Sequence, residues 1–134
     1  MNTSVSFELA KLLKEKGFDD ECKYYYDEDE ELNFHIGFIG DVWRNSEIKD
    51  GLPYNKENHR SPCVSAPTIT EVIMWLHEKH KIWLSVEWEN NAYRCTIQST
   101  TSRYRNVYNI LPNFSSPTKA YEAALLYTFK KLIP

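Results

Sequence analysis

The sequence has few residues that break or cross-link a chain. Its 134 residues include only four glycines, six prolines and three cysteines, which excludes collagen-like and Pro/Gly-rich low-complexity chains. No uninterrupted apolar run is longer than five residues, so no segment is suited to span a membrane. The N-terminus lacks a basic region, and Glu8 and Lys11 interrupt its apolar stretch. We therefore expect no signal peptide and a cytoplasmic protein.

The three cysteines, Cys22, Cys63 and Cys95, are an odd number and have no CxxC spacing. They cannot supply four thiol ligands to a metal, and a disulfide framework would leave one thiol over. We expect reduced, structural cysteines, because cysteine is among the residue types most often buried. The alternative is a nucleophilic Cys63 with His59 upstream, although no family signature surrounds that pair.

Charge is unevenly distributed along the chain. The formal net charge is −3, but residues 1–67 carry 14 acidic and 8 basic side chains, whereas residues 68–134 carry 5 acidic and 8 basic ones. The contrast is sharpest between residues 19–31, with eight acids, and residues 90–134, with six bases and one acid. Two interpretations stay open: these segments neutralise each other within the fold or between subunits, or each is a solvated surface.

The first helix is predicted over Val5–Lys16. Hydroxyl side chains stand before it as candidate N-caps, and leucines at helical spacing form one apolar stripe. Gly17 follows as the left-handed residue that ends a helix, and Phe18 as the hydrophobic contact that accompanies it.

Two further helices are marked by their N-terminal signals. The segment Thr68–Glu71 fits a capping box, and apolar residues at helical spacing follow it. Histidines and lysines crowd the C-terminal end of this helix, where the dipole favours positive charge. The last helix has Ser116 as N-cap and Pro117 at its first position, and it runs to about Leu132. Its predicted buried stripe consists of Tyr121, Ala124, Leu125, Thr128 and Leu132.

Strands are predicted between the helices. Cys22–Tyr26 and Asn33–Ile39 form one hairpin with the acidic run Asp27–Glu31 at its tip. Residues 40–66 show no regular pattern, and a stretch of that length is either a binding loop or contains a short hidden element. A weaker strand signal covers Val107–Leu111.

The hairpin around Asn90-Asn91 has a register that follows from its side chains. Two asparagines tolerate the positive φ angles of a two-residue type I′ turn, which makes Glu89 and Ala92 the flanking pair. One face is then polar, with Glu87 opposite Arg94, and a slip by one residue would destroy the pattern on both faces. The other face is apolar and carries Ile82, Leu84, Val86, Trp88, Tyr93, Cys95 and Ile97.

The element order is therefore α-β-β-α-β-β-α. Neither a repeat nor a linker divides the chain, so we expect one α+β domain over residues 1–134. The simplest architecture is two layers, with helices packed on an antiparallel sheet.

Motifs for catalysis and cofactors are missing or incomplete. There is no P-loop, GxGxxG or GxSxG. The histidines of His77–His80 are three apart, not four as in HExxH, so we interpret them as surface residues. Asp27–Glu31 resembles a calcium loop, but Leu32 and Phe38 stand where that loop needs glycine and glutamate. Gly37–Gly40 matches the GxxG of KH domains, but its apolar middle favours a strand end. We predict no catalytic residues, no metal site and no cofactor.

Aromatic residues are the one unusual feature, with nine tyrosines, six phenylalanines and four tryptophans. Tyr24, Tyr25 and Tyr26 cannot all face one way in a strand, and Trp83 falls on the polar face of its hairpin. Exposed aromatics are enriched in protein-binding hot spots and on base-stacking platforms. The surplus is either an aromatic-rich core or an interaction surface.

Three segments carry a resemblance. They are SFELAKLLKEKGFDDECKYYY at residues 6–26, SAPTITEVIMWLHEKHKIWLSVEW at 65–88 and SPTKAYEAALLYTFKKLI at 116–133. Together they resemble small uncharacterised proteins encoded by phages and prophages of anaerobic gut bacteria. Glycine often stands in that family where this chain has Lys81, so the end of the second helix differs here. The resemblance implies a phage context, and it transfers no functional residues because the family has no assigned activity.

Three functional hypotheses compete. The first is a non-enzymatic protein-binding or accessory module, with Trp83 as an anchor and self-association as one form of binding. The second is nucleic-acid binding through Arg94, Arg103, Tyr104 and Arg105, together with the lysines near the C-terminus, against which the pI near 5.8 stands. The third is an enzyme with a site assembled from dispersed residues: His59, Cys63 and His77.

Overall fold

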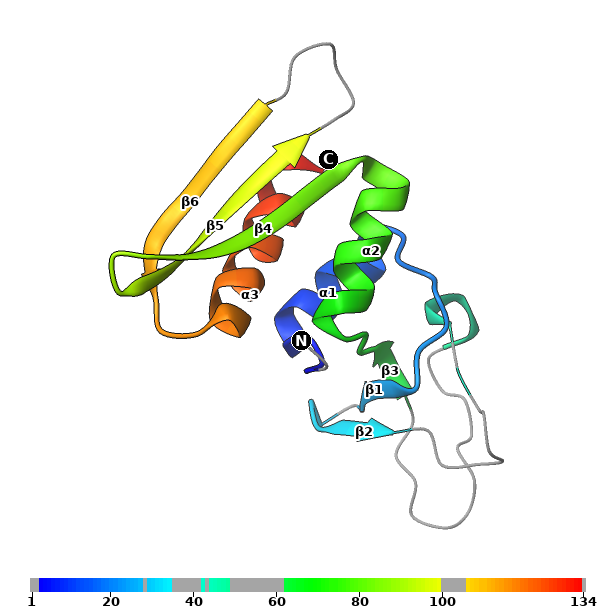
Figure 1. Ribbon diagram of the computed structural model, residues 1–134. Coiled ribbons are helices and arrows are strands. Elements are labelled where there is room, and N and C mark those ends of the chain that lie inside the picture. The colour runs from blue at the N-terminus through cyan, green and yellow to red at the C-terminus, as the bar shows by residue number, and fades with distance from the viewer. Residues whose placement is uncertain are drawn as a thin grey trace. The chain divides into compact units, whose positions relative to one another are not determined.

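The structure is a computed structural model and describes residues 3–27, 29–34, 42, 44–48, 62–99 and 106–133. It confirms the α+β class and broadly follows the predicted element order, with two further strands and two short helical segments in the described residues (Figure 1). The helices are α1 (Phe7–Glu15), α2 (Ile69–His80) and α3 (Pro117–Tyr127), and α3 continues as one π-helical segment, η2 (Thr128–Leu132). The strands are β1 (Tyr24–Asp27), β2 (Leu32–Phe34), β3 (Pro62–Ser65), β4 (Ile82–Glu89), β5 (Ala92–Ser99) and β6 (Asn106–Phe114).

The chain divides into two compact units, which we describe separately. One comprises Ser4–Pro67, and the other comprises Thr68–Pro134 together with Met1–Thr3. The strands form two antiparallel sheets rather than one, in the orders β2-β1-β3 and β4-β5-β6. The two-layer packing of the whole chain stays a prediction. No helix among the described residues is long and apolar enough to cross a membrane.

Helix α1 has the ends that its sequence predicts. The Ser6 hydroxyl accepts a hydrogen bond from the Leu9 amide at 3.2 Å and so caps the first turn. At the other end, Gly17 has a φ of 90°, and the Phe18 amide donates to the Leu13 carbonyl at 2.9 Å. This arrangement is a Schellman motif, and it leaves Phe18 fully buried.

The aromatic strand β1 sends its tyrosines in different directions, as predicted. Tyr25 is buried, whereas 41% of Tyr24 is exposed. The hydroxyl of Tyr26 donates to the Val5 carbonyl at 2.6 Å, and its ring packs edge-on against Phe7. This strand therefore attaches the sheet to the start of α1.

The acidic tip of the first hairpin is a turn stabilised by side-chain hydrogen bonds. Asp27 is fully buried, and its Oδ1 accepts hydrogen bonds from the amides of Asp29 (2.9 Å) and Glu31 (3.0 Å). Glu30 adopts a φ of 62° to complete the reversal. One carboxylate thus folds the turn, and the remaining described acids are exposed.

Helix α2 begins with the predicted capping box. The Glu71 amide donates to the Thr68 hydroxyl at 3.2 Å, and the Glu71 carboxylate accepts from the Thr68 amide at 3.3 Å. The helix ends at Lys81, which has a φ of 56° in the left-handed region. Lysine thus adopts here the left-handed conformation that glycine adopts most readily.

The β4–β5 hairpin has the predicted register throughout. Glu89 faces Ala92, Val86 faces Cys95, and Leu84 faces Ile97. Asn90 and Asn91 have φ angles of 52° and 62°, as a type I′ turn requires. The weak signal at Val107–Leu111 is confirmed as β6, which pairs with β5.

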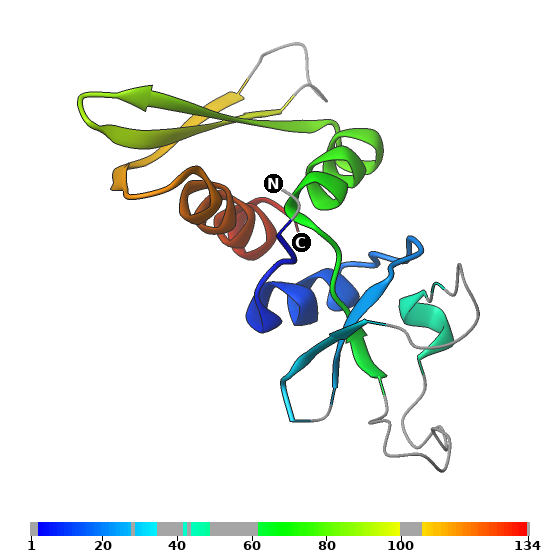
Figure 2. The same ribbon diagram turned by 60° about the horizontal axis from the view of Figure 1, so that its bottom comes forward.

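Helix α3 covers one face of the β4-β5-β6 sheet (Figure 2). Ser116 caps it by accepting from the Lys119 amide at 3.2 Å, and Pro117 stands at its first turn. Of its predicted stripe, Ala124, Leu125 and Thr128 are buried, whereas Tyr121 and Leu132 are half-buried. The prediction missed Ala120 and Phe129, which are also buried; they lie four residues from Ala124 and Leu125, so the buried face of the helix is wider than the predicted stripe.

Candidate interaction surface

The face of β4 and β5 opposite α3 carries two of the predicted site residues. We call it the outer face, and it carries Trp83, Ser85, Glu87, Glu89, Arg94, Thr96 and Gln98. Trp83 faces Gln98 and Glu87 faces Arg94 in the register, and cross-strand partners lie on the same side of a sheet. Trp83 and Arg94 are therefore on one face, separated by about 13 Å along the strands. The inner face, with Leu84, Cys95 and Ile97, is buried.

Trp83 is partly supported and partly exposed. Its ring meets the ring of His77 from α2 edge-on, with 5.1 Å between the centroids, and 39% of its surface remains accessible. The His77 Nδ1 is buried and has no hydrogen-bond partner among the described residues. The His77 ring therefore supports the indole, which still presents part of its surface to solvent.

Arg94 forms its ion pair with a residue other than the one opposite it in the register. Its guanidinium contacts the Glu89 carboxylate at 3.0 Å, diagonally across the hairpin, rather than Glu87 directly opposite. Both side chains of this pair remain accessible to solvent, so the pair is worth little to stability. Within the described residues Glu87 forms no ion pair, and it is exposed. The outer face consequently presents one uncompensated carboxylate.

Trp88 is the surface residue that the sequence did not reveal. The register places it on the inner, apolar face, yet 60% of it is exposed. Its ring meets that of Tyr93 edge-on, with 4.9 Å between the centroids. The alternation of side chains shows which face a residue is on but not how far a helix extends over that face. No pattern in the sequence indicates where α3 stops covering the inner face of the sheet.

The other predicted nucleic-acid residues do not form a described site. Arg103, Tyr104 and Arg105 lie outside the described residues. The lysines of the C-terminal segment, Lys130 and Lys131, are exposed near the end of the chain. Of the predicted aromatic and arginine site residues, only Trp83 and Arg94 lie within the described ranges, and Arg94 is paired with the Glu89 carboxylate.

The residues of the hypothetical dispersed enzyme are not brought together by any described contact. Cys63 lies in β3 and His77 in α2, in different units, and His59 lies outside the described residues. All three cysteines are free thiols, and Cys22 and Cys95 are buried as expected. Burial raises the pKa of Cys95 to about 12, and a hydrogen bond to the Thr96 backbone opposes this. Cys95 therefore stays a protonated thiol at neutral pH and is unsuited to nucleophilic attack.

Two other groups have altered pKa values because of their surroundings. Burial is the main cause of the raised pKa of Tyr121; Cys95 adds to it, and a hydrogen bond with the Val86 backbone opposes it. Desolvation lowers the pKa of His80, whose ring lies edge-on to Trp75 at 5.1 Å. Both shifts follow from packing and require no ligand.

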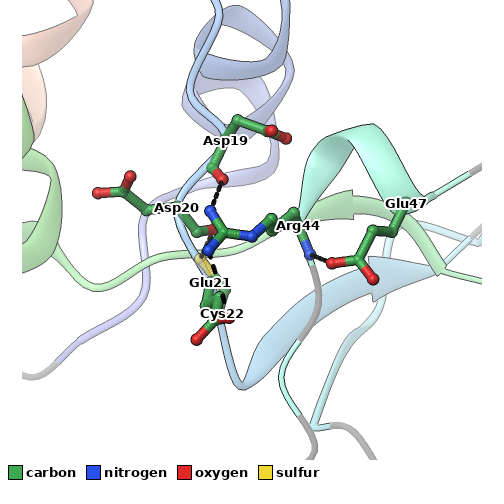
Figure 3. Close-up of polar contacts among 6 residues, drawn as sticks. All are labelled: Asp19, Asp20, Glu21, Cys22, Arg44 and Glu47. Atoms are coloured by element: carbon green, nitrogen blue, oxygen red, sulfur yellow. Dashed lines mark hydrogen bonds and ion pairs between the residues drawn. The ribbon is translucent and has the colours of Figure 1, made fainter.

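A polar cluster in the Ser4–Pro67 unit surrounds Arg44 (Figure 3). The Arg44 guanidinium donates to the Asp19 carbonyl at 2.9 Å and pairs with the Glu21 carboxylate at 3.3 Å. The Arg44 amide donates to Glu47, which closes the short 3-10 helix η1 (Asn45–Glu47). These contacts attach Arg44 and η1 to the connection between α1 and β1.

Asn45 is the buried centre of this attachment. Its Nδ2 donates to the Phe18 carbonyl at 2.8 Å, and its Oδ1 accepts from the Ser65 amide at 2.9 Å. A hollow of about 360 Å³ lies beside it, lined by Lys14, Gly17, Phe18, Asp19, Asn45 and Ser46. The polar side chains there already have protein partners: the Asp19 carboxylate accepts from the Ser46 amide, and Lys14 donates to the Cys63 carbonyl. We interpret this cluster as structural.

No group of three potential metal ligands converges in the part of the chain that the structure describes. No protein-family model, curated protein or solved structure matches the chain. The proposal below therefore depends on the geometry of the hairpin itself, which exposes Trp83 and the Glu87 carboxylate on its outer face and Trp88 on its inner face.

Proposed function

We propose that this protein is a non-enzymatic protein-binding module of phage or prophage origin, and that it binds through the β4–β5 hairpin. The observation that carries the proposal is the exposure of two tryptophans on one hairpin, Trp83 at 39% and Trp88 at 60%. Tryptophan is among the residue types most enriched in binding hot spots, because it buries a large area at a small cost in side-chain entropy.

The neighbourhood of these tryptophans supports this role. Met74 of α2 is 46% exposed, one helical turn before His77, on which Trp83 packs. The outer face around Trp83 is polar, with Ser85, Thr96 and Gln98 on the neighbouring positions. An apolar anchor within a polar surround is the usual organisation of a protein interface.

The test is the binding of purified variants. The tagged protein is used to capture partners from nuclease-treated host lysate, the partner is identified by mass spectrometry, and its affinity for the purified chain is then measured by calorimetry. Sedimentation measures self-association in parallel. We expect Trp83→Ala to weaken the affinity about tenfold or more, as truncation of a hot-spot residue does.

Tyr24→Ala is the matched control, because Tyr24 is an aromatic residue with similar exposure, 41%, on the other unit. Its affinity should equal that of the wild type. Thermal unfolding of each variant shows whether the fold is kept. Equal affinities for the wild type, Trp83→Ala and Tyr24→Ala would remove Trp83 as an anchor.

A further inference from the structure

We infer that the exposed half of β4, Val86–Glu89, binds an extended segment of the partner by strand addition. The segment would carry a basic residue opposite Glu87 and an apolar residue beside Trp88, in alternation. This inference rests on the proposed protein-binding function and specifies how the partner is held.

The pairing of β4 leaves one side of its backbone open. In the sheet order β4 is an edge strand, and among the described residues it pairs only with β5. The two-residue turn makes Glu89 and Ala92 a hydrogen-bonded pair, so Trp88 and Val86 are non-hydrogen-bonded positions. Their backbone amides and carbonyls therefore point away from β5. Tyr121 forms a hydrogen bond with the Val86 backbone. The Trp88 amide and carbonyl are therefore the main groups to which an added strand would hydrogen-bond.

The strand is regular over its full length. Eight consecutive residues pair with β5 without a bulge, and the strand contains no proline. Helix α2 contacts β4, and the ring contact between His77 and Trp83 lies at the start of the strand. In the second half of the strand, three consecutive residues are exposed: Glu87, Trp88 and Glu89. A long edge strand without a bulge or proline is a template for an added strand.

Charge identifies the occupant. Side chains alternate between the faces, so the residue of an added strand that lies opposite Glu87 projects onto the outer face beside an uncompensated carboxylate. The next residue projects to the inner side, beside the exposed Trp88 ring. A segment that alternates basic and apolar residues complements both positions.

A second copy of β4 fits this half of the edge poorly. Antiparallel self-pairing centred on Glu87 places Glu87 opposite Glu87 of the other copy, and self-pairing centred on Trp88 places Glu87 opposite Glu89. Like charges directly opposite each other destabilise a sheet. The glutamates thus act against self-pairing while they favour a basic strand.

The experiment measures the binding of short labelled peptides to the full chain by fluorescence anisotropy at one fixed salt concentration. One peptide alternates lysine and valine, and the other alternates glutamate and valine. We expect the wild type to bind the lysine peptide only. Glu87→Lys should weaken that binding about tenfold or more and should create binding of the glutamate peptide. Glu78→Lys, an exposed position on α2 with the same change in net charge, should leave both results as in the wild type.

N-methylation of alternate peptide amides tests the strand geometry. An added strand directs every second amide at β4, so methylating one alternate set should abolish binding, whereas methylating the other set should leave it unchanged. If both sets behave alike, or if Glu78→Lys changes binding as much as Glu87→Lys, the attraction is general electrostatics and strand addition is wrong. Failure of the lysine peptide to bind also overturns the inference. The Trp83→Ala test uses the native partner, so its outcome is independent of the outcome of these peptide experiments.

Discussion

At the scale of single residues, the end of α2 depends on a lysine in a glycine conformation. Lys81 has a φ of 56°, and its amide donates to the His77 carbonyl, which ends the helix. Left-handed geometry brings Cβ close to the carbonyl oxygen and costs a non-glycine residue about 1–2 kcal/mol. The chain must change direction at Lys81, because this single residue connects α2 to β4, which begins at Ile82. The fold tolerates the cost for that reason.

Lys81→Gly should therefore stabilise the protein. We expect the free energy of unfolding to rise by about 1 kcal/mol, since glycine adopts this conformation without the Cβ clash, although it also gains entropy when unfolded. Urea denaturation monitored by tryptophan fluorescence measures the change. Lys79→Gly is the control, because that residue is exposed within the helix and its replacement should destabilise by a similar amount. Equal destabilisation by both substitutions would contradict the left-handed assignment.

At the scale of elements, Asn45 connects three segments that are distant in sequence. The end of α1, the short η1 and β3 meet at its amide group, which is almost entirely buried. The sequence showed only an irregular stretch over residues 40–66, because an isolated asparagine has no periodicity and a three-residue helix has too few positions to show any. The β4–β5 register was predictable, in contrast, because eight consecutive pairs repeat the same alternation.

Asn45→Ala should destabilise the fold strongly. It removes the buried hydrogen bonds to the Phe18 carbonyl and the Ser65 amide, at a cost of about 2–4 kcal/mol for the two. Chemical denaturation measures the loss. Ser46→Ala, at an exposed neighbour whose contact is made by its backbone amide, should change stability by less than about 0.5 kcal/mol. Similar values for the two variants would show that the Asn45 hydrogen bonds contribute little.

At the scale of the whole molecule, the uneven charge coincides with the division into units. The boundary between Pro67 and Thr68 separates an acidic unit, with 14 acidic and 8 basic residues, from a basic one with 5 and 8. The basic unit keeps nucleic acid as an alternative ligand despite the formal net charge of −3. However, the one predicted arginine that can be placed, Arg94, is paired with Glu89.

We expect no salt-sensitive binding to nucleic acid. Labelled single- and double-stranded probes are titrated with the full chain at increasing salt. A protein that neutralises several phosphates loses affinity steeply, with a slope of about −0.9 per phosphate on logarithmic axes for duplex DNA. Weak binding without such a slope agrees with the protein-binding proposal. A slope corresponding to several phosphates, lost on Lys130→Glu with Lys131→Glu, would instead favour the nucleic-acid alternative.

The sequence by itself determined the features that local chemistry controls. Helix ends follow from hydrogen bonds between neighbours, as at Thr68 and Gly17, and the hairpin register follows from side-chain alternation around two asparagines. Only the tertiary structure decided the rest. The separation of the strands into two sheets, the burial of Asn45 and the exposure of Trp88 depend on which distant segments pack together. Such contacts are set by the shape and length of the packed elements, and no short window of sequence contains that information.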